Sequence, residues 1–176
     1  MVGPVAFATA WVGTGAATPG YSPVRDAISR LAATDAPHRG WMTAGFLAYG
    51  AGVTAFAVGD LRRTADGPGW LVAAVAGLST VGVALTPLGP GESDAAHWAF
   101  AGIGYVGVAL APLLSTPRSK WSQAAGGVAA VCLAATTTGV GDASGLFQRT
   151  GLTAAHAWIV ASALGLGRQQ SAPGPL

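Results

Sequence analysis

Residues 20–50 have the sequence GYSPVRDAISRLAATDAPHRGWMTAGFLAYG, in which a polar, turn-rich half precedes an apolar half. The polar half carries serine, arginine, aspartate and histidine side chains, and the apolar half begins at Trp41. Most of the remaining chain repeats this alternation, with long apolar runs separated by short polar segments. Apolar runs of this kind are typical of helices that cross a membrane. The polar half is therefore expected to form the first loop between two such helices.

The composition supports this interpretation, because 51% of the 176 residues are hydrophobic and 9% are charged. A soluble domain averages roughly 25% charged residues. The net charge of +2 is small and divided among the polar segments, so nucleic acid is not an expected partner. Cys132 is the single cysteine, which excludes an internal disulfide and a cysteine-based metal cluster. Membrane lipid is the expected surrounding partner.

Six apolar segments predict an all-α integral membrane fold, a six-transmembrane-helix bundle. The segments are residues 2–17, 41–59, 70–88, 95–114, 121–140 and 151–167. They form one predicted domain over residues 1–168, and residues 169–176 are a predicted disordered cytoplasmic tail. Small-residue pairs that permit close helix packing are Ala44 with Ala48, Ala73 with Gly77, and Gly107 with Ala111. Tryptophans suited to the membrane interface are Trp41, Trp70, Trp98 and Trp121.

The positions of lysine and arginine predict the orientation. Six crossings place both termini on the same side of the membrane. The connections on that side, together with the tail, carry Arg62, Arg63, Arg118, Lys120 and Arg168. The short basic turns after the second and fourth segments lie closest to helix ends and weigh most in the positive-inside rule. We therefore expect a multi-pass protein of the cell membrane with both termini in the cytoplasm.

The first outer loop is predicted to contain a short amphipathic helix. Ser22 is a good N-cap, and Pro23 suits the first turn of a helix. The apolar face would carry Val24, Ala27, Ile28 and Leu31, and the polar face Arg25, Asp26, Ser29 and Arg30. Such a helix would lie along the outer surface or fold over the mouth of the bundle.

The same loop carries a recognisable pattern of residues. The pattern consists of Tyr21-Ser22-Pro23, Asp26, Ser29, Leu31, Pro37 and Gly45-Phe46, with His97 and Gly145-Leu146-Phe147-Gln148-Arg149 further along the chain. It resembles the bacterial polytopic membrane protein family known as domain of unknown function 998 (DUF998). The resemblance implies a helical bundle in the bacterial inner membrane and supplies no established reaction.

Polar residues gather on the predicted outer side, where they could form the mouth of a ligand site over the apolar bundle. The candidate ligand-binding residues are Ser22, Asp26, Ser29, His38, Gln148, Arg149 and Trp158. A lipid-like or small amphipathic molecule would suit a polar mouth above an apolar interior. The alternative to a ligand site is that the outer loops are polar simply because they are exposed to water. For Gln148 and Arg149 in particular, an anion-binding role and a solvated anchor are both open.

The candidate catalytic residues are His97, His156 and Asp94. Asp94 and His97 are three residues apart at a helix start, so the carboxylate could orient the imidazole. The alternative is an acid favoured by the helix dipole beside an interfacial histidine. His156 is expected five residues inside the sixth helix, where an ionisable side chain needs a partner. It either serves a functional site or bonds to a neighbouring helix near Thr136–Thr138.

Metal and haem sites are the remaining chemical alternatives. His97 and His156 could ligate a haem, and His38 or Asp142 could complete a zinc site. The sequence has no paired-histidine motif, so no metal site and no cofactor is predicted.

Two functions remain open. One is a binding protein for an amphipathic ligand. The other is a membrane-embedded enzyme, such as a lipid hydrolase, isomerase or cyclase, that uses His97, His156 and acids among Asp26, Asp94 and Asp142. A homo-oligomer is compatible with either.

Overall fold

The computed structural model describes residues 2–89, 94–139 and 142–165, and these residues are all helical or in short connections. The elements are α1 (Val2–Ala17), the 3₁₀ helix η1 (Ile28–Ala32), α2 (Arg39–Phe56), the π-helical turn η2 (Ala57–Leu61), α3 (Arg62–Thr64), α4 (Gly69–Leu85), α5 (Ala95–Ser115), α6 (Lys120–Thr138) and α7 (Ser144–Ala163). α2, η2 and α3 form one continuous helix, Arg39–Thr64. The predicted all-α bundle is confirmed, and the predicted tail at 169–176 lies outside the described residues.

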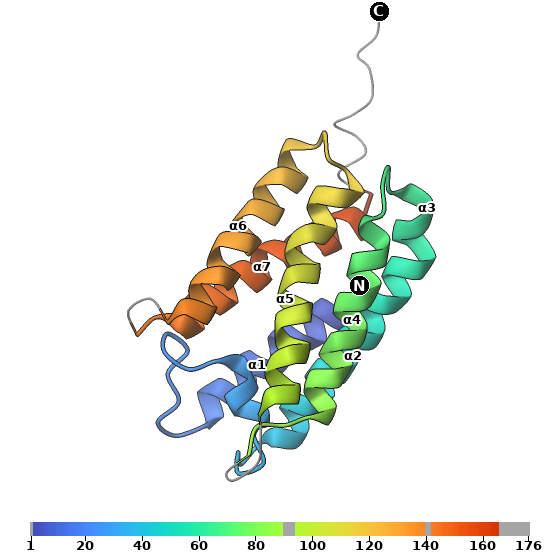
Figure 1. The fold of residues 1–176 in the computed structure, drawn as a ribbon. Helices are drawn as coiled ribbons and strands as arrows, with labels where there is room; N and C mark the ends of the chain where they lie inside the picture. The colour runs from blue at the N-terminus through green and yellow to red at the C-terminus, as the bar shows by residue number, and fades with distance from the viewer. Residues whose placement is uncertain (1, 90–93, 140–141, 166–176) are drawn as a thin grey trace, which may run out of the picture.

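The helices follow one another around the bundle in chain order (Figure 1). α1 packs on α2, α2 on α4, α4 on α5, α5 on α6, and α6 on α7. Residues 18–38, 86–89 and 142–143 lie together at one end, called here the loop end, where the Thr34 N–H donates to the Leu88 carbonyl. Residues 65–68 and 116–119 form the opposite turn end, where the Asp66 N–H donates to the Ser115 carbonyl.

α1 and α7, the first and last helices, meet mainly through side chains. The Phe7 and His156 ring centroids are 5.6 Å apart, and the Arg149 guanidinium lies 5.1 Å from the centre of the Trp11 ring. This α1–α7 seam differs from the other helix contacts, where small residues bring backbones together. A Cβ at Gly50 of α2 would lie 2.7 Å from the Gly77 carbonyl oxygen of α4. The seam is therefore the looser side of the bundle.

The small-residue positions are confirmed in part. A Cβ at Gly107 would lie 2.7 Å from the Cβ of Ala76, so the glycine is needed where α5 crosses α4. Gly77 likewise meets the backbone of α2. Ala44 instead is exposed and contributes little to helix packing. Close approach of backbones, as small residues permit, therefore fixes the α2–α4–α5 side of the bundle.

The last helix begins earlier than the sequence predicts. α7 starts at Ser144, seven residues before the expected start at residue 151. Gln148 and Arg149 are thus helical and buried, not loop residues beside a helix, and a solvated anchor is excluded for them. The hydropathy pattern did not predict helix over residues 144–150, because this stretch contains polar side chains, and these find hydrogen-bond partners only in the folded bundle. His156 consequently lies twelve residues into the helix, about 18 Å along its axis at ~1.5 Å per residue.

The predicted amphipathic helix of the first loop is also wrong. Residues 23–26 form a turn closed by the Asp26 N–H donating to the Ser22 carbonyl, and the 3₁₀ helix η1 follows. The Asp26 carboxylate accepts a bond of 2.7 Å from the Ser22 N–H, which favours the turn over continued helix. Ile28, Ser29 and Leu31 are all buried, so η1 packs into the bundle instead of lying on its surface.

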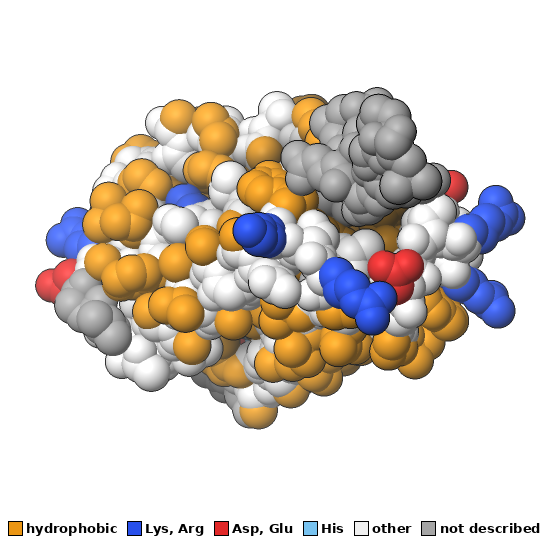
Figure 2. Space-filling view, turned by 90° about the horizontal axis from the view of Figure 1, so that it is seen from above, with side chains coloured by type: hydrophobic (Ala, Val, Ile, Leu, Met, Phe, Trp, Pro, Cys, Tyr) orange, Lys and Arg blue, Asp and Glu red, His pale blue; other side chains and the backbone are white. Residues whose placement is uncertain are grey.

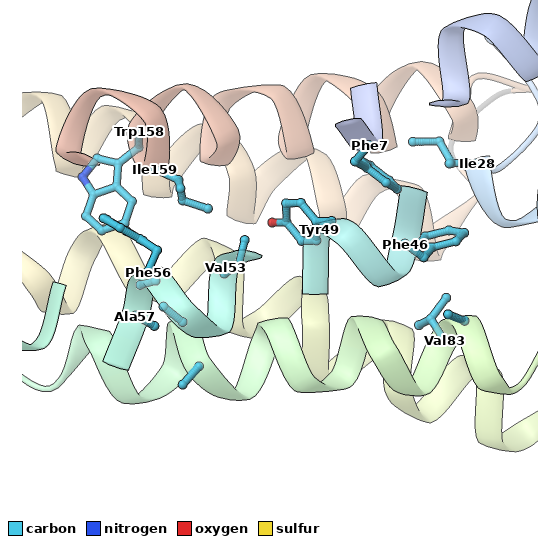
Figure 3. Packing of buried hydrophobic residues seen from close by; sticks show 14 of the residues in the cluster. Phe7, Ile28, Phe46, Tyr49, Val53, Phe56, Ala57, Val83, Trp158 and Ile159 are labelled. Carbon is cyan, nitrogen blue, oxygen red and sulfur yellow. The ribbon is translucent and has the colours of Figure 1, made fainter. Parts of the chain in front are cut away.

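The apolar core extends along the bundle between the two ends (Figure 3). Trp158 and Phe56 lie at one end of the view, and Phe7, Phe46 and Ile28 lie toward the other. Tyr49 occupies the middle. The candidate site lies toward the loop end of this core.

The outer surface is strongly apolar. Trp41 is 75% exposed and Leu85 71% exposed, and hydrophobic side chains cover much of the face in Figure 2 among a few charged ones. Within the described residues, two helices, Arg39–Thr64 and Ala95–Ser115, are long and apolar enough to cross a membrane. α1 and α4 are apolar but shorter.

Candidate functional site

A partly open cavity lies in the loop-end half of the bundle, between α1, α2, α4, α5, α7 and η1. Its walls are Phe7, Ile28, Ser29, Phe46, Tyr49, Thr80, Val83, His97, Phe100, Ala101, Gly104, Tyr105, Val108, Gln148, Leu152 and His156. The space open to the centres of water-sized molecules is about 50 Å³. One water needs roughly 10–15 Å³ on this measure, so a few waters or one small chemical group fit.

His97 enters the cavity from the first turn of α5 and is 2% exposed. Its Nδ1 lies 2.7 Å from the Thr86 carbonyl oxygen at the end of α4. A carbonyl oxygen accepts hydrogen bonds and cannot donate them, so Nδ1 carries the hydrogen. Nε2 is buried and has no hydrogen-bond partner in the protein. The backbone of Thr86 therefore orients this imidazole, a role that the sequence analysis gave to Asp94.

His156 enters the same cavity from the middle of α7. Its ring centroid lies 4.7 Å from that of Tyr49 and 5.6 Å from that of Phe7, and its Nε2 is buried without a protein partner. The expected bond to the threonines of α6 is not present at Thr136, whose hydroxyl donates to the carbonyls of Cys132 and Ser144. His156 is thus an imidazole packed among aromatic rings with one nitrogen unpaired.

Tyr49, from the middle of α2, adds a third unpaired polar group. Its side chain is buried, and its hydroxyl has no hydrogen-bond partner in the protein. Tyrosine hydroxyls in protein interiors usually find a partner. Three buried polar atoms that lack protein partners, from Tyr49, His97 and His156, therefore belong to residues that line one cavity.

Gln148 connects the first loop to the cavity wall. Its Oε1 accepts a 2.8 Å bond from the Ile28 N–H, and its Nε2 donates to the Tyr105 hydroxyl. Both partners line the cavity. Gln148 therefore holds η1 in place across the loop end of the cavity.

Arg149 fixes the preceding part of the loop. Its Nη1 donates to the carbonyl oxygens of Pro23 at 2.7 Å, Asp26 at 3.0 Å and Gly145 at 2.9 Å, and its Nη2 donates to the Tyr21 hydroxyl. Burial raises the pKa of Tyr21, and the nearby guanidinium acts in the opposite direction. The hydroxyl thus keeps its proton at neutral pH and donates it to the Ala27 carbonyl at 3.2 Å.

The structure brings together four of the predicted site residues and separates the others. His97, His156, Ser29 and Gln148 line the cavity, and Arg149 supports the loop above it. Ser22 and Asp26 bond to each other within the turn. Asp94 accepts a 3.4 Å bond from the Gly89 N–H, and His38 lines a separate surface groove between α1 and α2.

Trp158 belongs to the other half of the bundle. Its Nε1 donates to the Ser122 hydroxyl at 2.9 Å, close to the turn end. Figure 3 shows it beside Phe56, away from Ile28 and Phe46 of the cavity wall. The residue is a core packing element of that half.

The described residues contain no group of three or more His, Cys, Asp or Glu side chains arranged to hold a metal ion. Among those residues, the cavity wall includes no carboxylate. The cavity wall instead carries imidazole, hydroxyl and amide groups among apolar and aromatic side chains.

Tyr49 and Tyr105 are cavity residues that the sequence analysis missed. Each carries a hydroxyl in a long apolar helix, and a buried hydroxyl usually needs a partner. That signal was available in the sequence. The orienting role of Thr86 was not, because it uses a backbone carbonyl.

Over the described residues, the fold and the cavity together define an all-helical bundle with a mostly apolar cavity between its helices. A family model described as "Protein of unknown function (DUF998)" matches residues 1–165. The chain belongs to this family, which confirms the resemblance seen in the loop motif. No curated protein and no solved structure matches it.

Proposed function

We propose that this chain is a polytopic integral membrane protein that crosses the cell membrane six times, with both termini in the cytoplasm. The two longest apolar helices support the proposal, because 44% and 39% of their most apolar windows are buried within the protein. Less than half of each window is therefore buried, whereas the core helix of a soluble protein is mostly buried. Exposed apolar side chains on this scale need a nonaqueous surrounding.

The proposed activity is the binding of a lipid-like or small amphipathic molecule on the outer side, with its polar group in the cavity. One observation carries this proposal. The buried polar atoms of Tyr49, His97 and His156 have no protein partners, and all three residues line the same small space. An unsatisfied buried polar group costs about 1–3 kcal/mol, so a ligand group that bonds to it would gain that free energy.

Purification in mild detergent, followed by mass spectrometry of the bound small molecules, tests the proposal. We expect an amphipathic molecule to accompany the protein and to be lost from the His156→Ala and His97→Ala variants. His38→Ala is the matched control, because His38 lines a different groove. Equal retention of the molecule by all three variants would refute the cavity as its site.

A membrane-embedded enzyme such as a lipid hydrolase, isomerase or cyclase is the second candidate. It is favoured by the convergence of His97 and His156 on one cavity. The Asp94 carboxylate, which was expected to orient His97, does not line it, and neither do Asp26 and Asp142. Catalysis would therefore rely on the imidazoles and the Tyr49 hydroxyl. Conversion of the co-purified molecule by the wild type and not by His97→Ala would favour this candidate.

A further inference from the structure

Arg149 is the single aspartate, glutamate, lysine or arginine side chain in the described ranges that is buried, at 8% exposed. Its hydrogen bonds go to three backbone carbonyl oxygens and to the Tyr21 hydroxyl, all of which are uncharged. Its guanidinium lies 5.1 Å from the centre of the Trp11 ring and 5.5 Å from that of Tyr21. Buried charges in proteins are usually paired with an opposite charge, because leaving water is costly. Among the atoms that the structure describes, Arg149 bonds to no anion.

Asp26 offers Arg149 a carbonyl oxygen instead of its carboxylate. The Nη1 of Arg149 donates to the Asp26 carbonyl at 3.0 Å, whereas the Asp26 carboxylate accepts the Ser22 N–H at 2.7 Å. The carboxylate is thus used within the turn of the first loop. The charge of Arg149 can therefore still be compensated by an anion from outside the chain.

Arg149 also lines a groove along the α1–α7 seam. The groove has a volume of about 350 Å³, and Val5, Ala8, Ala157 and Val160 contribute to its mainly apolar lining. Val5 and Ala157 are exposed, so the groove faces the surroundings of the bundle. It forms where α1 and α7 meet through side chains and their backbones stay apart. In a membrane such a groove would be filled by hydrocarbon.

The groove has the length of one membrane leaflet. Its lining residues on α7 extend from Arg149 to Val160, eleven residues apart, which is about 16 Å at ~1.5 Å per residue. α1 runs in the opposite direction, with Trp11 beside Arg149 and Phe7 beside His156. The hydrocarbon core of a bilayer is about 30 Å thick, so one leaflet contributes roughly 15 Å. The cation lies at the loop end of this length, where a lipid head group would be.

We propose that the α1–α7 groove binds one acyl chain of an anionic membrane lipid, whose phosphate lies beside Arg149 at the loop end. The apolar side chains between Arg149 and Val160 contact the acyl chain, and the guanidinium charge selects the head group. This selection needs no direct hydrogen bond, because Coulomb attraction between unit charges acts over several ångströms in a partly apolar surrounding. A lipid without net charge would fill the same groove and leave the buried charge uncompensated.

This site is separate from the cavity, and it rests on the membrane location that the proposed function assigns. Ile28, Leu152 and His156 line both spaces and form a common wall. The lipid stays on the groove side of that wall. His97 lines the cavity and not the groove, so it provides a variant that affects the cavity alone.

Native mass spectrometry of the purified full chain measures the selectivity. The probes are phosphatidylglycerol, which is anionic, and phosphatidylcholine, which has no net charge, with identical acyl chains. We expect the first molecule of phosphatidylglycerol to bind about fivefold more tightly, as one basic side chain near an anionic lipid would give. Inorganic phosphate should not displace it, because phosphate has no chain to fill the groove.

Variants separate the charge of Arg149 from its role in the first loop. Arg149→Gln removes the charge and should abolish the selectivity, whereas Arg149→Lys should retain it. Gln148→Met is the matched control, because it removes the loop bond to Ile28 and leaves the charge in place. Ala157→Trp should fill the groove and weaken both lipids about tenfold, whereas Val131→Trp on the exposed face of α6 should not.

Photocrosslinking locates the acyl chain. Phosphatidylglycerol with a diazirine at the end of one chain is bound to the wild-type protein, illuminated, and the labelled peptides are identified by mass spectrometry. We expect labels on residues 4–8 of α1 and 156–160 of α7, about one leaflet away from Arg149. His97→Ala should be labelled at the same places. The measurement needs no Arg149 variant, so it remains decisive whatever those variants do to the fold.

Each result supports or overturns the lipid site. Equal affinity for the two lipids, or selectivity that survives Arg149→Gln, would overturn the anionic head group. Labels concentrated on α5 and α6, or displacement of the lipid by inorganic phosphate, would overturn the groove as the site of the chain. None of these results affects the cavity ligand, which is tested with His97→Ala. A protein that takes up no lipid at all and stays dispersed without detergent would instead overturn the proposed membrane location.

Discussion

Gln148→Met tests whether α7 holds the first loop over the cavity. The two side chains have similar length, but methionine lacks the strong acceptor that Oε1 offers to the Ile28 N–H at 2.8 Å. The substitution leaves that buried donor unpaired, at a cost of about 1–3 kcal/mol. Since ~1.4 kcal/mol corresponds to a factor of ten, local opening of η1 should become roughly 5- to 150-fold more frequent.

Amide hydrogen exchange in detergent, followed on peptides covering residues 24–34, measures this opening directly. We expect faster exchange at Ile28 in the variant, with little change in α5 or α6. Thr150→Val is the matched control on the same helix, because Thr150 is exposed and its hydroxyl bonds within the helix to the Leu146 carbonyl.

Unchanged exchange at Ile28 in Gln148→Met would refute the reasoning, since it would mean that the bond to Gln148 does not hold η1. Equal acceleration in Thr150→Val would also count against it, because the effect would then belong to α7 as a whole. Faster exchange at Ile28 together with loss of the co-purified molecule would further connect the loop to the cavity.

Three other predictions concern the bundle. Gly77→Ala should lower the melting temperature, because its Cβ would lie 2.8 Å from the Gly50 carbonyl oxygen. Gly127 has open space around it, so Gly127→Ala should instead raise the free energy of unfolding by up to about 1 kcal/mol. Trp158→Phe should cost about 1 kcal/mol of stability by removing the bond to Ser122, yet retain the ligand; loss of ligand would extend the site to the turn end. In a Cys132→Ala background, cysteines at Thr34 and Asp66 should react with membrane-impermeant reagents from opposite sides of the membrane, and reaction from one side would disprove the proposed topology.

The first loop illustrates a limit of sequence patterns. Val24, Ala27, Ile28 and Leu31 have helical spacing, yet residues 23–26 form a turn and η1 is a buried 3₁₀ helix. The spacing of apolar residues indicates which side chains are to be buried, and both a surface helix and a turn followed by a 3₁₀ helix bury them. The observed turn and η1 are stabilised by the Asp26 side chain within the turn and by Gln148, whose Oε1 bonds to the Ile28 N–H from 120 residues away in the sequence.

For the two histidines, the sequence predicted the burial but not the hydrogen-bond partner. His97 and His156 were selected because ionisable groups in apolar helices need partners, and both line the cavity. The partner assigned to His97 from helical spacing was Asp94, whereas the structure has the Thr86 carbonyl. Spacing along one helix identifies residues that share a face, but it does not reveal a backbone carbonyl on the preceding helix.

The sequence by itself determined the helical class, the family and the approximate positions of the long helices, because apolar runs and a short motif depend on neighbouring residues. Tertiary structure alone decided that α7 begins at Ser144, that η1 turns inward, and that Tyr49, His97 and His156 line one space. The physical reason is that a polar group can be buried at low free-energy cost only if it finds hydrogen-bond partners, and here these come from segments distant in the sequence. Those partners are set by how the helices pack.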